Sequence, residues 1–218
     1  SAISRVLMVN NTPHKKCDVV IVGGGLSGLL LGYFLKKHRP ELTFKILEKR
    51  ERYTHDRHWA FWLNKKTSFE FPELLEKTYP TWQVNEHHIS SSMYDYAVIN
   101  SGKFYAFMTQ PLKEHIMFSE TPQNISKHSV TLSGGDILEA EKVFSSAPTN
   151  QKTNPKKEKE GLWQTFYGWH VQTKNPVFTP EKAVIMDFFN PQTLDSAFGF
   201  HYVLPFSAHE ALVEPTIF

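Results

Sequence analysis

Residues 18–48, DVVIVGGGLSGLLLGYFLKKHRPELTFKILE, decide the fold of this chain. The β-branched run at 18–22 is typical of a strand that is buried on both faces. Leucines and a phenylalanine within 29–35 predict an apolar helix face, and the basic residues 36–38, followed by Pro40, predict the end of that helix. Residues 42–48 predict a second strand. Together these elements form a β-α-β unit of the usual length of about 30 residues.

A glycine motif joins the first strand to the helix. Gly23 permits the tight turn, Gly25 lets a pyrophosphate approach the backbone, and Gly28 lets the helix pack on the sheet. The helix N-terminus offers N–H groups to phosphates. Glu48 follows at the distance where a carboxylate accepts both ribose hydroxyls, which favours FAD or NAD over NADP. The predicted cofactor-binding residues are Gly23, Gly24, Gly25, Leu26, Ser27, Gly28, Glu48 and Lys49.

The composition narrows the class of protein. The chain has 218 residues, of which 40% are hydrophobic, and this is enough for a buried core and excludes wholesale disorder. A formal charge of +2 is too small to indicate nucleic acid as a partner. The single cysteine excludes an internal disulfide. No apolar run reaches about 18 residues and no secretory pattern is present, so we expect a cytoplasmic globular protein.

The first three quarters of the chain divide into a leader, a domain and a loop. Residues 1–16 are polar and predict a flexible leader. Residues 17–160 predict the FAD-binding domain, with a β-hairpin insertion at 94–108 and a helix over 112–118. Residues 145–161 hold prolines and four lysines and predict an exposed loop. A nucleic-acid patch is the alternative for these lysines, and the neighbouring glutamates disfavour it.

Residues 161–218 predict a second sheet. Aromatic and β-branched runs are separated by turn residues, and they lie at 162–173, 183–189, 197–206 and 211–218. Nothing helical lies between them, so we predict an antiparallel substrate-domain sheet that is truncated at the C-terminus. The fold class is therefore α/β, a Rossmann-like FAD/NAD(P)-binding domain with an antiparallel sheet. By analogy of fold, such a sheet suits a flavin domain better than a classical dehydrogenase.

The stretch DRHWAFW at 56–62 places an acid, a base and aromatic rings in a loop region. Arg57 is a candidate contact for a flavin pyrophosphate or ring, and a surface salt bridge is its alternative. His55 and His58 lack a third ligand at a supporting spacing, so we predict no metal site.

Two carboxyl groups stand within apolar strands. Glu214 and Asp187 are each either solvent-facing residues or carboxyls of raised pKa that can donate a proton, and spacing alone favours the first reading. The sequence has neither a GxSxG elbow nor a GxxxxGK[ST] loop, which removes the commonest hydrolase and nucleotide-hydrolysing classes.

The order of these motifs resembles the bacterial-type lycopene cyclase family, FAD-dependent enzymes of carotenoid biosynthesis. GGGLSG is shared by many flavoproteins, whereas four other stretches are more specific: DRHWAFW at 56–62, IMDFF at 185–189, YVLPFS at 202–207 and ALVEPT at 211–216. The resemblance runs from about residue 18 to residue 218. Relatives continue beyond it, so the chain looks like an N-terminal fragment whose own activity stays open.

The resemblance implies a chemistry. Family members cyclise the ψ-ends of lycopene to β-type rings without net oxidation, using reduced FAD with NAD(P)H as electron source. Glu214 matches the family's catalytic acid, and the candidate substrate-contacting residues are Trp59, Phe61 and Asp187. The rings of Trp59, Phe61 and Trp62 are candidates for stabilising the cation, and core packing is their alternative. Because lycopene is insoluble in water, the resemblance also implies peripheral association with the inner face of the membrane.

Three positions depart from the family pattern, and two other functions stay open. Pro215 stands where relatives have an acid or an aromatic residue, Phe189 where they often have Arg, and Ala147 where Arg commonly follows serine. One alternative is a flavin-dependent monooxygenase or other oxidoreductase of the same fold, although the expected Asp-Gly pair is replaced at 145–148. The other is a non-catalytic carotenoid- or lipid-binding protein.

Overall fold

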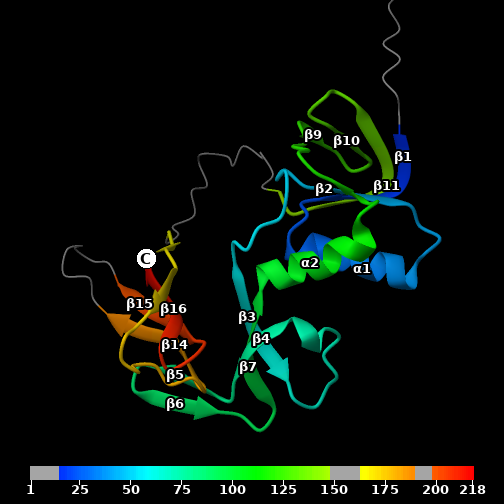
Figure 1. The fold of residues 1–218 in the computed structure, drawn as a ribbon. Coiled ribbons are helices and arrows are strands. Elements are labelled where there is room, and N and C mark those ends of the chain that lie inside the picture. The colour runs from blue at the N-terminus through cyan, green and yellow to red at the C-terminus, as the bar shows by residue number, and fades with distance from the viewer. Residues whose placement is uncertain (1–14, 148–162, 190–197) are drawn as a thin grey trace, which may run out of the picture. The chain divides into compact units, whose positions relative to one another are not determined.

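The computed structural model describes residues 15–147, 163–189 and 198–218 (Figure 1). Among these, 15–54 and 105–147 form one compact unit, here called unit 1. The others, 55–104 with 163–189 and 198–218, form unit 2. Residues 1–14 of the predicted leader and the lysines of the predicted loop lie outside the described residues.

Unit 1 is built on a six-stranded sheet of order β8-β2-β1-β11-β10-β9 (Figure 1). Its strands are β1 Lys15–Val22, β2 Phe44–Leu47, β8 Ile116–Met117, β9 Asn124–Ile125, β10 Ser129–Thr131 and β11 Ile137–Ser145. β1 pairs in parallel with β2 and β11, and helix α1, Leu26–His38, connects β1 to β2. The side chains of Val20, Leu29 and Ile46 are fully buried. The predicted β-α-β unit is therefore confirmed.

The hairpin predicted at 94–108 is wrong. Strand β7, Tyr94–Asn100, agrees with the prediction, but helix α2, Ser101–Leu112, replaces the second strand. The side-chain oxygen of Asn100 accepts hydrogen bonds from the backbone N–H groups of Gly102 at 2.8 Å and Lys103 at 3.3 Å, as a helix N-cap does. Phe104, Met108 and Leu112 are buried at helical spacing. The Asn-Ser-Gly sequence thus begins a helix and does not turn a hairpin.

The helix predicted over 112–118 is also wrong. Helix α2 ends at Leu112, and residues 116–117 form β8 in parallel with β2. The backbone N–H of Ile46 donates to the carbonyl of His115 at 2.8 Å, and that of Glu48 donates to the carbonyl of Met117 at 2.9 Å. The open edge of β2 therefore determines the structure of this segment, and a partner so distant in sequence leaves no local signal.

Unit 2 contains two sheets. The smaller is antiparallel, in the order β3-β7-β4, and includes β3 His58–Asn64 and β4 Leu75–Tyr79, which follows the short helix η1 Pro72–Leu74. The larger has the order β12-β16-β15-β14-β5-β6, with β13 also on β16. Its strands are β5 Thr81–Val84, β6 His87–Ser90, β12 Thr165–Phe166, β13 Trp169–Gln172, β14 Lys182–Phe189, β15 Gly199–Pro205 and β16 Glu210–Ile217.

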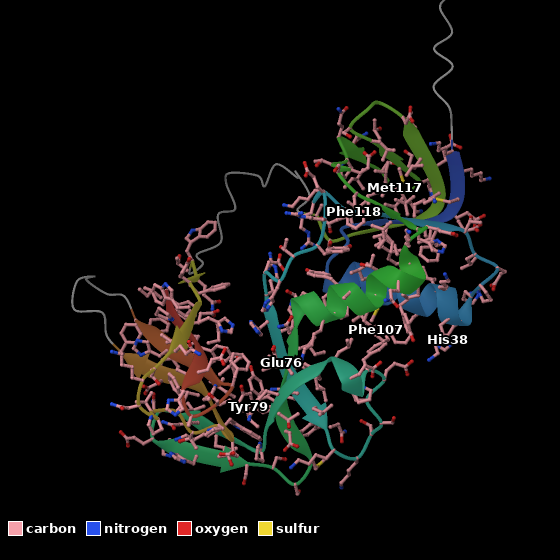
Figure 2. All side chains as sticks on the ribbon, viewed as in Figure 1. His38, Glu76, Tyr79, Phe107, Met117 and Phe118 are labelled. Carbon is pink, nitrogen blue, oxygen red and sulfur yellow. The ribbon has the colours of Figure 1, made fainter. Side chains whose placement is uncertain are left out.

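The C-terminal strands pair as predicted, but they do not form the larger sheet alone. β14, β15 and β16 are antiparallel neighbours, and β12 and β13 are antiparallel to β16. β5 pairs in parallel with β14. Tyr79 of β4 donates its hydroxyl proton to the carbonyl of Pro205 on β15 at 3.0 Å, and Figure 2 labels this side chain. Residues 55–104 therefore group with the C-terminal sheet, in contrast to the predicted boundaries of 17–160 and 161–218.

Candidate functional site

The glycine turn of unit 1 has the geometry of a phosphate-binding turn. Gly23 has a φ of +105°, and a Cβ there would lie 2.1 Å from the hydroxyl oxygen of Ser146. A Cβ on Gly28 would lie 2.0 Å from the carbonyl oxygen of Gly23, so close helix–strand packing requires glycine there. At Gly25, in contrast, a Cβ would meet nothing within 4 Å. Gly25 is the N-cap of α1 without a side-chain cap, and the first turn carries no acid. This leaves the helix N-terminus and an open space for an anion.

Glu48 lies immediately after β2, beside this turn. Its carboxylate is buried and accepts hydrogen bonds from the backbone N–H of Arg50 at 2.9 Å and from the Arg50 side chain at 2.9 and 3.0 Å. Burial would raise the pKa of Glu48, but these hydrogen bonds and the Arg50 charge outweigh it and hold the pKa below its ordinary value. Glu48 is therefore an anion that can accept hydrogen bonds from ribose hydroxyls.

An aromatic stack completes the neighbourhood of Glu48. The rings of Tyr53 and Tyr105 are stacked at 4.2 Å, and the guanidinium of Arg50 lies 4.8 Å from the Tyr53 ring. Phe118, labelled in Figure 2, meets Tyr53 edge-on at 5.2 Å. The Tyr53 hydroxyl is buried without a hydrogen-bond partner among the described residues. An unpartnered buried hydroxyl and the open space at the glycine turn both fit a bound dinucleotide.

Sequence reasoning missed Arg50, Tyr53 and Tyr105. Arg50 had a usable signal, because it stands two residues after the strand-ending acid and can therefore fold back onto it. The two tyrosines had none, since their stacking joins distant segments of unit 1.

Two predicted cofactor contacts are exposed. Lys49 follows Glu48 and points to solvent. Arg57 belongs to unit 2, where its side chain lies 3.8 Å from the carboxylate of Asp56. The backbone N–H groups of Asp56 and Arg57 both donate to the hydroxyl of Ser101 at 3.0 Å. Arg57 thus makes a surface ion pair, and its contact with a flavin stays a prediction.

Glu214 is half-buried on β16. It stands directly opposite Tyr202 of β15, whose hydroxyl lies 2.9 Å from that of Tyr96 on β7. Burial raises the pKa of both tyrosines, so the pair is neutral. On the other side a Cβ at Gly168 would lie 3.5 Å from Oε2 of Glu214. Among the described residues Glu214 has no hydrogen-bond or ion-pair partner, and burial raises its pKa.

The aromatic residues of β3 face in two directions, because side chains alternate along a strand. Trp59 packs on Phe104 with ring centroids 5.3 Å apart, and Phe61 packs on Phe69 at 5.4 Å. Trp62 instead contacts Tyr96 at 4.8 Å and also Trp82 of β5 at 4.5 Å. The structure therefore brings Trp62 into the aromatic group beside Tyr202 and Glu214, and it does not bring Trp59 or Phe61 there.

Asp187 is not brought together with Glu214. It is exposed on β14 and in register with His201, which is in register with Pro215 on β16. Consecutive residues of a strand face opposite sides, so Asp187 and Glu214 lie on opposite faces of the sheet. Phe189 stacks on His201 at 4.4 Å.

The tertiary structure supplies a third imidazole beside His55 and His58. The rings of His58 and His170 lie 5.2 Å apart, and His170 stacks on Phe206. His58 Nε2 lies 3.2 Å from a carboxylate oxygen of Glu76. Burial, and then the neighbouring imidazole of His58, lower the pKa of His55. No group of three or more His, Cys, Asp or Glu side chains in the described part of the chain is arranged to hold a metal ion.

Solved structures share this fold. A geranylgeranyl bacteriochlorophyll reductase-like protein of Thermoplasma acidophilum matches 93% of this chain and 57% of its own, with a TM-score of 0.60 and 13% identity. The p-nitrophenol 4-monooxygenase of Pseudomonas putida matches 92% of this chain and 57% of its own, with a TM-score of 0.57 and 13% identity. CtdE, solved in complex with FAD, matches 93% of this chain and 59% of its own, with a TM-score of 0.57 and 14% identity. The chain therefore has a Rossmann-type flavoprotein fold.

The comparison of sequences is more specific than the fold. The lycopene beta-cyclase of Pseudescherichia vulneris is 24% identical over 205 residues, which cover 91% of this chain and 51% of that protein. The chain thus spans about half the length of this curated relative. Within the described ranges no helix is both long and apolar enough to cross a bilayer. The family described as lycopene cyclase protein matches residues 18–218. With the glycine turn, the acid after β2 and the specific C-terminal strands in place, this chain belongs to the lycopene cyclase family.

Proposed function

We propose that the complete protein cyclises the ψ-ends of lycopene to β-type rings, with Glu214 as the general acid. The observation that carries the proposal is the setting of Glu214, a half-buried carboxyl without an ion-pair partner in the described part of the chain. An alkene is a weak base, so its protonation needs a neutral acid that is shielded from water. A raised pKa keeps more of the Glu214 carboxyl in this neutral form.

The proposed reaction is an isomerisation. The Glu214 carboxyl gives its proton to the terminal double bond of a ψ-end, whose π electrons form the new C–H bond and leave a carbocation. The next double bond attacks this cation, and a C–C bond closes the ring. A carbon beside the new cation then loses a proton to the Glu214 carboxylate and a double bond forms. The acid is regenerated, and neither an oxidant nor a reductant is consumed.

The rings around Tyr202 are suited to a cationic substrate. Trp62 contacts both Trp82 and Tyr96, and the Tyr96 hydroxyl is hydrogen-bonded to that of Tyr202, the residue opposite Glu214. The faces of aromatic rings attract cations, most strongly in the case of tryptophan. Trp62 is therefore a better candidate for cation stabilisation than Trp59 or Phe61, which pack elsewhere.

FAD is the proposed cofactor, held by unit 1. The N-terminus of α1 and Gly25 would bind the pyrophosphate, Glu48 the ribose hydroxyls, and the Tyr53 hydroxyl a polar group of the dinucleotide. When bound, reduced FAD, with NAD(P)H as its electron source, supplies electron density that stabilises positive charge. Because lycopene is insoluble in water, peripheral association of the complete protein with the membrane is part of the proposal.

The test compares two carboxyls of β16 in the complete gene product. Glu214→Gln removes the proposed acid, and Glu210→Gln makes the same change at a half-exposed residue of the same strand. Lycopene conversion is measured with FAD under reducing, oxygen-free conditions. We expect Glu214→Gln to lower the rate by about 10²–10⁴-fold, the usual contribution of a general acid, and Glu210→Gln to leave it nearly unchanged. The absorbance of bound flavin, after free flavin is removed, confirms that both variants are loaded.

Three results contradict the proposal. Full lycopene conversion by the Glu214→Gln variant would show that Glu214 is not the general acid. Oxygen consumption with a reduced nicotinamide, in place of conversion, indicates a monooxygenase of this fold. Retention of unchanged lycopene by the wild-type protein indicates a carotenoid-binding role.

A further inference from the structure

The edge of the larger sheet is interrupted opposite Glu214. β12 pairs with Thr216 and Ile217 of β16, and β13 pairs with residues 210–213. Glu214 and Pro215 therefore have no paired residue on this side among the described residues, although Tyr202 and His201 pair with them on the other. Pro215 has no backbone N–H, so it cannot donate to a ladder on either side.

Gly168 lies in this break, next to the carboxyl. A Cβ at 168 would lie 3.5 Å from Oε2 of Glu214 and 3.2 Å from Cδ1 of Leu212. The backbone of Gly168 is outside the left-handed region, so no turn requires glycine here. What glycine provides is space: any side chain longer than that of alanine would extend over the Glu214 carboxyl.

The two flanks of Glu214 differ. On the β15 side, the hydrogen-bonded Tyr202 and Tyr96 close the approach, and Trp62 contacts Tyr96. On the edge side the segment is exposed, with Phe166 at 58% and Trp169 at 52% of full exposure. Phe166 and His170 are the neighbours of Gly168 that alternate onto its face of the sheet.

We propose that the substrate reaches the Glu214 carboxyl across Gly168, between β12 and β13, and that the absence of a side chain at 168 makes this approach possible. The inference rests on the proposed role of Glu214 and adds the direction of approach and a specificity-determining position. The missing side chain at 168 leaves room over the carboxyl for a slender, apolar, extended chain, whereas a side chain longer than that of alanine would displace it. Pro215, which departs from the family pattern, contributes by keeping the edge unpaired.

The test measures access to position 214 without using cyclase activity. Glu214→Cys is introduced together with Cys17→Ala, which removes the only native thiol. The rate at which maleimide labels this thiol in the folded chain is measured by mass spectrometry. The rate is compared for chains with Gly, Ala or Leu at position 168. Gly134→Leu is the control for the same substitution away from Glu214, because a Cβ at Gly134 meets nothing within 4 Å and the residue lies in unit 1.

We expect Gly168→Leu to slow labelling at least about tenfold, because a covered thiol reacts only through local opening, and Gly168→Ala to slow it less than about threefold. Gly134→Leu should leave the rate unchanged, and all variants should label alike in urea. The proposal is overturned if the folded Gly168→Leu variant is labelled as fast as the chain that keeps Gly168. If tryptophan fluorescence shows that Gly168→Leu does not fold, the smaller Gly168→Val takes its place with the same criterion.

The outcomes separate this inference from the proposed function. If Glu214→Gln keeps full lycopene conversion, the role of the acid is refuted, while the labelling rates still report whether position 168 covers position 214. If conversion requires Glu214 and Gly168→Leu shields the thiol, the same Gly168→Leu change should lower lycopene conversion in the complete protein. Unchanged conversion in that variant would refute the approach over Gly168 alone.

Discussion

Replacement of Gly28 by alanine tests the close packing of α1 on β1. The new Cβ would lie 2.0 Å from the carbonyl oxygen of Gly23 and 3.2 Å from Cγ2 of Ile21. Real Cβ contacts are not this short, and the blocking atom is backbone, which no rotamer change can move away. The helix must therefore shift from the strand, or the glycine turn must open.

The magnitude follows from two opposing effects. Alanine gains up to about 1 kcal/mol over glycine within a helix. Overpacking against a rigid neighbour costs about 1–3 kcal/mol. Because the new Cβ meets a backbone oxygen, we expect Gly28→Ala to lie at the upper end of this range. We expect a net loss of about 2 kcal/mol in the free energy of unfolding of unit 1. Gly32→Ala should cost less than Gly28→Ala, since its Cβ meets side chains and not backbone: Cδ1 of Ile46 at 2.7 Å and the Phe44 ring at 3.3 Å.

The assay can separate the two units. All five tryptophans, at positions 59, 62, 82, 163 and 169, belong to unit 2, so tryptophan fluorescence follows that unit. Far-UV circular dichroism follows the helices and sheets of both. In urea titrations Gly28→Ala should shift the circular dichroism transition to lower urea and leave the fluorescence midpoint in place. Gly28→Ala that is as stable as the wild-type chain, or more stable, would refute the packing argument.

Further predictions concern the nucleotide turn, Glu48 and the core of unit 2. Gly25→Ala should leave the free energy of unfolding unchanged, since its Cβ meets no atom within 4 Å. It should nevertheless weaken FAD binding in a fluorescence titration, because the methyl group occupies the space of the pyrophosphate. An FAD affinity equal to that of the wild-type chain would contradict this. The pKa of Glu48 is lowered from 4.5, so its stabilising contribution is complete above pH 4.5 and is lost as the pH falls through the folded-state pKa. Glu48→Gln should therefore flatten the acid side of the stability–pH curve, measured by urea unfolding, and an unchanged curve would show that Arg50 does not hold this carboxylate. Tyr79→Phe should lower the stability of unit 2 by about 1–2 kcal/mol, because the buried carbonyl of Pro205 loses its donor; an unchanged fluorescence midpoint in urea would argue against that hydrogen bond.

The sequence by itself determined the features that depend on neighbouring residues. The β-branched run, the glycine spacing and the acid at Glu48 predicted the β-α-β unit, because strand period, helix period and turn geometry are local properties. The C-terminal strands were predicted for the same reason. The hairpin prediction at 94–108 is wrong because Asn-Ser-Gly occurs both in turns and at helix starts, and the helical spacing of Phe104, Met108 and Leu112 is the signal that distinguishes them.

Only the tertiary structure decided which distant segments meet. The pairing of β5 with β14 placed residues 55–104 in unit 2, and the edge of β2 made a strand of 116–117. The orientation of β3 brings Trp62, and not Trp59, to Tyr96, and the pairing of β12 and β13 with β16 places Gly168 beside Glu214. These contacts depend on register between strands, which local spacing does not encode, because hydrogen bonds between backbones are the same for every residue except proline.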